Sequence, residues 1–324
     1  MMLNNLKVKE FKGIKECERP IEFSKFNLLM GANNAGKSSI LEALFLFPTP
    51  NVPLPLFGRD RFEVLEWLHG DLKAVIYRYS GVGVVECEVK NKTFSLELEL
   101  EAGRRALKIS IEKAPVSLNL REIAEALGGG LSEDELLTYV IFIPNSDEFR
   151  KNLARELANR WDEVEKTGAH VRLVDHFISK VVEDKFTEIT LRRSEMVIRK
   201  ELPGDVAYVR LSDVGDGIKR FLTSALWVEA IQPKVVLWDD LESSAHPSLI
   251  NAIIEWLMSR DWQVVASTHS IDVLRELVVA EPKEAKVIQL RKSYDDMLSW
   301  KELSLDEVED LINKGQDVRK LFRW

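Results

Sequence analysis

The stretch GANNAGKSS, residues 31–39, has the residue types and spacing of a phosphate-binding loop. It fits the pattern G-x-x-x-x-G-K-[ST], because its two glycines stand five apart and Lys37 and Ser38 follow at once. Backbone N–H groups of such a loop point at phosphate, the lysine reaches the β- and γ-phosphates, and the serine ligates Mg²⁺. We expect these residues to contact a nucleotide: Gly31, Asn33, Asn34, Ala35, Gly36, Lys37, Ser38 and Ser39.

Two carboxylates follow the apolar run VVLW at residues 235–238. Asp239 stands where a strand-end carboxylate would hold Mg²⁺ opposite Ser38, and Asp240 where a general base would orient an attacking water. Acidic residues also cap turns after strands, but the phosphate-binding loop in the same chain favours the functional interpretation.

Two further segments place polar residues where a phosphate could meet them. His269 follows the apolar run WQVVAST and could reach the γ-phosphate or the attacking water, although a lone histidine is more often structural. In LSDVGDG, Ser212, Gly215 and Gly217 precede a helix, whose N-terminus could meet an anion. The alternative for this segment is an ordinary helix cap made by Ser212 or Asp216.

These residues need a sheet to bring them together. Residues 26–30, 235–238 and 262–268 are short apolar runs, and each leads towards an amphipathic segment, which predicts parallel strands covered by helices on both faces. The candidate residues follow the strands directly. They therefore fall at the carboxyl edge, where open α/β sheets bind ligands.

The rest of the chain divides by its hydrophobic period. Four alternating segments within residues 73–113 predict an antiparallel meander, and the proline-rich residues 47–61 predict an irregular surface loop. Helices are predicted over residues 120–127, 146–167 and 171–186, followed by a hairpin at 187–200. We expect an N-terminal lobe (1–113), a mostly helical insert (114–204) and a C-terminal lobe (205–324).

Composition limits the function classes. With 324 residues, 45% of them hydrophobic, the chain can bury a large core, and a net charge of −8 argues against a surface that binds polyanions overall. Local basic pairs occur at Arg104-Arg105, Arg192-Arg193 and Lys219-Arg220, but such pairs are usually solvated. No apolar run approaches 18 residues and no leader pattern is present, so we expect a cytoplasmic protein without a membrane partner.

Taken in order, the motifs resemble those of the ABC-type ATPase heads of SMC, RecF and OLD-like AAA proteins. The matching segments are EFKGIK at residues 10–15, GANNAGKSSILEAL, LSDVGDG, VVLWDDLESSAHP and STHS. The resemblance implies a P-loop NTPase fold of class α/β, with a mixed sheet, an antiparallel β subdomain and a helical insert. It covers both ends of the chain and little of residues 104–204.

The resemblance also implies a mechanism. Such heads pair head-to-tail and trap two ATPs, so Ser212 and the turn from Gly215 to Gly217 would face the γ-phosphate held by the partner's loop. Asp240 and His269 would position the water, with Lys37 on the phosphates, and Asp239 would share Mg²⁺ with Ser38. Lys12, in the opening turn, would approach the nucleotide.

This chain departs from that pattern in three ways. Asp240 replaces the usual glutamate, whose side chain is one methylene longer, so slow hydrolysis is expected. Residues 47–204 contain no glutamine for the expected Q-loop. Neither a long coiled coil nor a Toprim domain is evident, which argues against nuclease activity.

Two functions follow as alternatives. The first is an ATPase that forms a homodimer on ATP binding and serves DNA repair, DNA maintenance or defence. The second is a nucleotide-dependent switch with little hydrolysis that recruits a protein partner. DNA as a partner rests on the resemblance alone.

Overall fold

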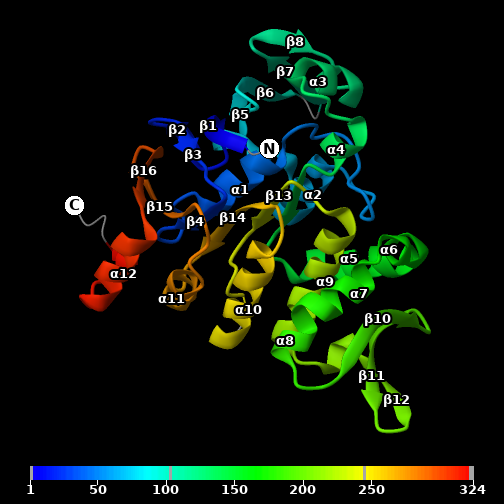
Figure 1. Ribbon diagram of the computed structural model, residues 1–324. Coiled ribbons are helices and arrows are strands. Elements are labelled where there is room, and N and C mark those ends of the chain that lie inside the picture. The colour runs from blue at the N-terminus through cyan, green and yellow to red at the C-terminus, as the bar shows by residue number, and fades with distance from the viewer. Residues whose placement is uncertain (1–2, 102–103, 244–245, 321–324) are drawn as a thin grey trace.

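The computed structural model describes residues 3–101, 104–243 and 246–320, which build one large mixed sheet with helices on both sides and a helical part carrying a second, small sheet (Figure 1). Among these residues the large sheet has thirteen strands. In sheet order they are β8 (Ala114–Val116), β7 (Arg104–Ile111), β6 (Lys92–Glu101), β5 (Val82–Val89), β1 (Leu3–Phe11), β2 (Ile14–Cys17), β16 (Met297–Leu303), β15 (Ala285–Lys292), β4 (Phe26–Met30), β14 (Gln263–Thr268), β13 (Val235–Trp238) and β9 (Val140–Ile143), with β3 (Ile21–Glu22) beside β1.

The strands that lead to the candidate residues form the parallel half of the sheet. β9, β13, β14, β4 and β15 pair in parallel, as the apolar runs predicted for β4, β13 and β14. Every residue of β4, β9, β13 and β14 is buried, because helices cover both faces. The loops after these strands therefore share one edge.

Helices cover this half from two sides. α1 (Lys37–Phe45) contacts β13 and β14 as well as β1 and β5, so the sheet curls around it. α10 (Pro247–Met258) and α11 (Ile271–Ala280) lie side by side on the opposite face (Figure 1). α12 (Leu305–Asn313) packs beside α11 and β15. In the described part of the chain, no helix is long and apolar enough to cross a membrane.

The antiparallel meander is confirmed for β5, β6 and β7, but the strand predicted at residues 73–79 is wrong. That segment forms two short 3₁₀ helices, η1 (Leu72–Val75) and η2 (Tyr77–Tyr79). Val75, Ile76 and Tyr77 are buried in succession, which a half-exposed strand cannot do. The backbone also turns left-handed next to them, at Arg78 with φ 53°.

The segment at residues 47–61 is irregular, as predicted, but it does not lie on the surface. Leu54 and Phe57 are buried, and Phe57 stacks near Phe149 and Trp227. Arg61, the first residue of α2 (Arg61–His69), is fully buried and donates to the Thr49 carbonyl oxygen at 2.9 Å. Large apolar side chains thus draw the loop into the core.

The region expected to be mostly helical also supplies strands. β9 lies within residues 114–204 yet is the edge strand of the large sheet. The predicted hairpin is present and gains a third strand. The elements here are α3 (Leu120–Leu127), α4 (Glu133–Leu137), α5 (Asp147–Asn159), α6 (Trp161–Thr167), α7 (Ala169–Leu173), the π-helical turn η3 (Val174–Ile178), α8 (Ser179–Val181), β10 (Phe186–Arg192), β11 (Glu195–Leu202) and β12 (Asp205–Arg210). The helix predicted at 146–167 is divided at Arg160, whereas the one predicted at 171–186 is continuous from Ala169 to Val181, with a π-helical turn inside it, and ends before residue 186.

A buried carboxylate ties the helical part to the parallel half. Glu229 lies in α9 (Asp216–Ile231) and is fully buried. Its Oε1 accepts from Arg260 Nη2 at 2.6 Å and from Trp256 Nε1 at 2.9 Å, both in or just beyond α10. Arg172 of α7 donates to the Glu229 carbonyl oxygen at 2.8 Å. Three helices thus meet on one residue.

We expect Glu229→Gln to lower the free energy of unfolding by about 3 kcal/mol, because Arg260 would be left partly buried without an anion. Glu255→Gln, on the exposed face of α10, is the matched control and should change stability by less than about 0.5 kcal/mol. Urea denaturation followed by circular dichroism gives both values. Equal denaturation midpoints for the two variants would contradict the prediction.

Candidate functional site

The loop between β4 and α1 has the shape its glycines predict. A Cβ atom on Gly31 would lie 2.5 Å from the Leu290 carbonyl oxygen and 2.9 Å from the Ala35 Cβ, so no larger residue fits. Gly36, at the N-terminus of α1, has φ 98°, a conformation that side chains rarely adopt. The loop therefore wraps closely under the start of α1, and the N-terminus of a helix favours an anion.

Lys37 lies inside this loop. Its Nζ donates to the carbonyl oxygens of Gly31 at 3.0 Å and Ala32 at 3.2 Å, and it lies 3.4 Å from His269 Nδ1. Only 5% of the residue is exposed, and this burial lowers the pKa of its ammonium group. A buried cation whose hydrogen-bond partners are two carbonyl oxygens and a histidine nitrogen is prepared to gain an anionic ligand.

A pocket of about 390 Å³ opens above the loop. Nearly all the residues predicted from the loop line it, together with His269, Lys12, Gly13 and Lys292. Lys292, at the end of β15, is held by the Gly13 carbonyl oxygen at 2.9 Å and by Asp296 at 3.0 Å. Three lysines, from three different elements, therefore surround one pocket, which suits an anion.

Ser38, which lines the pocket, contacts Asp239, which does not line it. The Ser38 hydroxyl donates to Asp239 Oδ2 at 2.9 Å, and the Ser267 hydroxyl donates to Oδ1 at 2.6 Å. Burial raises the pKa of the Asp239 carboxyl, and the negative charge of Asp240 adds to this shift. A cation at this position would relieve both effects.

Ser38 and Asp239 could hold Mg²⁺ only together with ligands that the protein does not supply. Within residues 3–101, 104–243 and 246–320, no three or more His, Cys, Asp or Glu side chains gather as a metal site. One hydroxyl and one carboxylate are too few ligands alone, but Mg²⁺ is commonly bound by one or two carboxylates together with substrate phosphates and waters. Ser38 and Asp239 therefore fit an ion that arrives with a nucleotide.

Asp240 and His269 lie next to this pair. Asp240 Oδ1 is 3.6 Å from His269 Nε2, and Oδ2 accepts from Asn145 Nδ2 at 3.0 Å. Asp240 itself is left-handed, with φ 49°, and its N–H donates to Ser267 at 2.8 Å. The Asp240 carboxylate is thus fixed on one side and faces His269 on the other.

Of the described residues in the segment LSDVGDG, Gly215 and Gly217 do not line the pocket above the loop. The segment's backbone forms the turn η4 (Leu211–Asp213), while the side chain of Ser212 lies outside the described part of the structure. Gly215 caps α9 with φ 90°, and a Cβ there would meet nothing within 4 Å. Gly217 lines a separate small cavity together with Asp239 and Ser243. Within one chain, Gly217 therefore lies near Asp239 but does not line the pocket above the loop.

Four residues at the site were not predicted from the sequence: Asn145, Glu242, Ser267 and Lys292. Glu242 accepts from the His269 N–H at 2.7 Å and from the Thr268 hydroxyl at 2.9 Å, so it holds the loop after β14. Asn145 follows the apolar run VIFI just as Asp239 follows VVLW, which is a signal that could have found it. Ser267 and Lys292 stand within strands and carry no such signal.

A family model described as "AAA domain, putative AbiEii toxin, Type IV TA system" matches residues 26–275 of the chain. An ATP/GTP phosphatase of Helicobacter pylori is 22% identical over 86% of this chain and 88% of its own length. An uncharacterized protein of Methanocaldococcus jannaschii, MJECL10, is 39% identical over 66 residues, which are 20% of this chain and 30% of that protein.

Solved structures show the same fold. An SMC head bound to the C-winged helix domain of ScpA has a TM-score of 0.65 at 16% identity, covering 94% of this chain and 99% of that one. The SMC head domain from Thermotoga maritima gives 0.54 at 18% identity, covering 94% and 100%. The recombination mediator protein RecF gives 0.52 at 14% identity, covering 94% and 98%. The predicted P-loop NTPase fold is thereby confirmed.

Proposed function

The chain belongs to the AAA-domain family whose model matches residues 26–275. From that premise we propose that the chain binds ATP together with Mg²⁺ and hydrolyses the ATP in a head-to-tail homodimer. The observation that carries the proposal is the contact between the Ser38 hydroxyl and the Asp239 carboxylate at 2.9 Å beside the buried Lys37. In a P-loop ATPase these are the groups that hold Mg²⁺ and the phosphates.

Each residue has a proposed role in the reaction. Lys37 and the N–H groups of residues 31–39 bind the β- and γ-phosphates. Ser38 and Asp239 hold Mg²⁺, which neutralises developing charge when bound. Asp240 accepts a hydrogen bond from the attacking water, and His269, 3.6 Å away, contacts the γ-phosphate.

Dimerisation completes the site in this proposal. Of the described residues in this segment, Gly215 and Gly217 do not line the pocket above the loop of their own chain, which supports a contact with the phosphate held by a second copy. Since Gly215 opens α9 with free space around it, the helix N-terminus is accessible to the γ-phosphate of that copy.

We expect ATP and Mg²⁺ to shift Asp240→Asn, in which turnover is blocked, from monomer to dimer. Ser212→Arg in the same background should prevent the shift, because it places bulk and charge at the interface. Ser194→Arg, in the exposed turn between β10 and β11, is the control and should dimerise normally. Light scattering measures the molar mass. The same molar mass with and without ATP in all three proteins would refute the ATP-dependent dimer.

A second function, a nucleotide-dependent switch with little hydrolysis, is favoured by one observation. The Asp240 carboxylate is shorter than a glutamate and is already engaged by Asn145 at 3.0 Å. Measured turnover separates the two functions: ATP-driven dimerisation without phosphate release would identify the switch.

We also propose a DNA or protein partner, in DNA repair, DNA maintenance or defence. The proposal is supported by the likeness to RecF, described as a recombination mediator, and to an SMC head bound to a domain of ScpA. The basic pairs do not strengthen the case for DNA: Arg192 stacks on Tyr208 at 3.3 Å, and Arg220 pairs with Asp147 at 3.3 Å. The side chains of Arg104 and Arg105 lie outside the described residues.

A further inference from the structure

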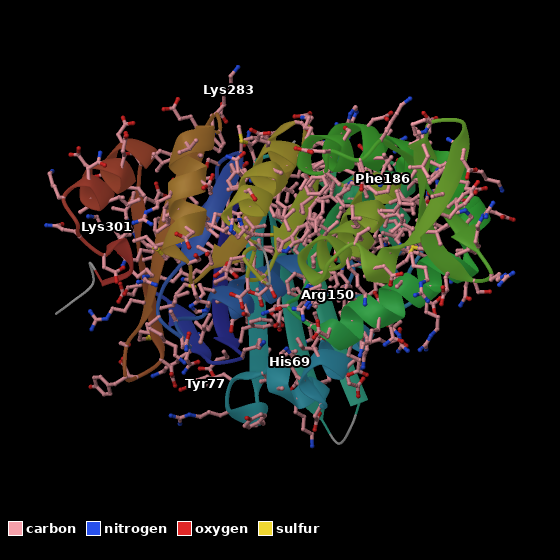
Figure 2. The ribbon with its side chains drawn as sticks, turned by 90° about the horizontal axis from the view of Figure 1, so that it is seen from below. His69, Tyr77, Arg150, Phe186, Lys283 and Lys301 are labelled. Atoms are coloured by element: carbon pink, nitrogen blue, oxygen red, sulfur yellow. The ribbon has the colours of Figure 1, made fainter. Side chains whose placement is uncertain are left out.

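Three charged or titratable side chains meet beside the phosphate-binding loop, and one of them, Lys12, lines the pocket above it. Lys12 comes from the turn between β1 and β2, Glu42 from α1, and His69 from the end of α2 (His69 is labelled in Figure 2). Glu42 Oε2 is 2.6 Å from Lys12 Nζ and 2.9 Å from His69 Nε2, and these two nitrogens are 3.0 Å apart. The Glu42 side chain is only 4% exposed.

The hydrogens of this cluster cannot satisfy all three contacts together. An ammonium group only donates, and an ionised carboxylate only accepts. A neutral His69 that donates from Nε2 to Glu42 has no lone pair there for Lys12. The other tautomer accepts from Lys12 but turns a lone pair towards the carboxylate. A protonated His69 donates a hydrogen bond to Glu42, but its positive charge repels the Lys12 ammonium group at 3.0 Å.

Glu42 needs one of the two cations. Burial pushes the pKa of its carboxyl upwards, but the hydrogen bond from His69 and the charge of Lys12 outweigh burial, so the pKa lies below its ordinary value. A buried carboxylate without a cationic partner is costly. Lys12 can therefore leave Glu42 only if His69 becomes charged and takes over its place.

The Lys12 ammonium group could contact a phosphate in place of Glu42, because Lys12 lines the pocket above the phosphate-binding loop. The other two lysines of the pocket are held by partners of their own, Lys37 by carbonyl oxygens and Lys292 by Asp296. The phosphates of a nucleoside triphosphate carry more negative charge than the Glu42 carboxylate, which Lys12 shares with His69.

We propose that Glu42 and His69 are positioning residues for Lys12, and that nucleotide binding moves the Lys12 ammonium from Glu42 to the phosphates while His69 takes up one proton from solvent. This inference rests on the proposed ATP binding. The proton comes from water or the buffer acid, forms the second N–H bond of the imidazole and leaves the conjugate base in solution, and the imidazolium donates to Glu42 through Nε2. The charge around Glu42 is the same before and after.

The proton uptake by His69 depends on the side chains that contact its ring. Of the described titratable side chains, only Lys12 and Glu42 contact the His69 ring in a hydrogen bond or ion pair. On η1, which packs against α2, Asp71 accepts from the Lys73 N–H at 2.8 Å and thus caps its own helix. Because binding takes up a proton, affinity should rise as pH falls.

The test is calorimetric titration of the full chain with a non-hydrolysable ATP analogue and Mg²⁺, in phosphate and in Tris buffer at pH 7.5. The dependence of the binding heat on the ionisation heat of the buffer counts the protons taken up. We expect the wild type and His176→Gln, an exposed histidine serving as control, to take up between half a proton and one proton per nucleotide (about 0.5–1). His69→Gln should take up close to none.

Glu42→Gln is the second variant and should also lose the uptake, because a neutral amide no longer requires a cation; its circular dichroism reports folding. Wild-type binding without proton uptake would overturn the inference alone, as would undiminished uptake in His69→Gln. A wild type that shows no binding heat in either buffer, with no change in thermal unfolding on adding the analogue, would overturn the proposed function and the inference with it.

Discussion

Replacing Lys37 with alanine is expected to lower the affinity for ATP by on the order of a hundredfold. Hydrogen bonds to charged groups contribute about 1.5–3 kcal/mol each, and each 1.4 kcal/mol is a factor of about ten in affinity. Lys37 is the one lysine that the loop itself encloses, with its Nζ 3.0 Å from the Gly31 carbonyl oxygen. Its loss removes the cation closest to where the β- and γ-phosphates would lie.

The fold should survive this change. Lys37 contacts carbonyl oxygens of its own loop and not the apolar core, so circular dichroism of Lys37→Ala should match that of the wild type. Lys301→Ala, an exposed lysine on β16 far out in the molecule (Figure 2), is the control for charge and should bind ATP normally. Fluorescence titration with a labelled ATP measures both. Unchanged affinity in Lys37→Ala would refute the assignment of the loop.

Asp240→Asn is expected to reduce ATP turnover by on the order of a hundredfold while leaving ATP affinity within about twofold, because general-base catalysis contributes about 10²–10⁴ in rate. Ser38 and Asp239 would still hold Mg²⁺ in this variant. Asp306→Asn, an exposed carboxylate in α12, is the matched control. Steady-state phosphate release is the measurement, and wild-type turnover in Asp240→Asn would leave His269 as the candidate.

The length of this side chain offers a further comparison. Asp240→Glu moves the carboxylate by about one bond, and misplacement on the order of 1 Å can change a rate ~10²-fold. Asn145 holds Asp240 Oδ2 at 3.0 Å, and a longer side chain would break this contact. Slower turnover in Asp240→Glu would therefore show that the site is adapted to aspartate, whereas faster turnover would show a site shaped for glutamate.

The sequence pattern was sufficient for the centre of the fold because fully buried strands leave an unbroken apolar run. FNLLM, VVLW and QVVAST became β4, β13 and β14, and the polar residues after them reached one edge. The pattern failed where burial did not follow a simple period. Val75, Ile76 and Tyr77 are buried in succession in 3₁₀ turns, and the proline-rich 47–61 segment is drawn inward by Leu54 and Phe57.

In the candidate site, residues next to a recognisable motif were found and those brought by distant pairing were missed. Lys292 lines the pocket because β15 pairs with β4. The sequence around Lys292 does not indicate this pairing. Asn145 reaches the site because β9 pairs with β13, although its segment was assigned to a helical region. Long-range strand order, set by the whole sheet, decides such placements.

The close approach of Gly31 to the Leu290 carbonyl oxygen has a consequence for synthesis on the ribosome. The phosphate-binding loop leaves the ribosome more than 200 residues before β14 and β15, the two strands that flank β4. Until both have emerged, β4 has two unpaired edges, a state prone to wrong pairing and suited to chaperones. A ligand of this pocket can therefore assist folding only after β14 and β15 have emerged, since the residues that line the pocket are brought together by these strands.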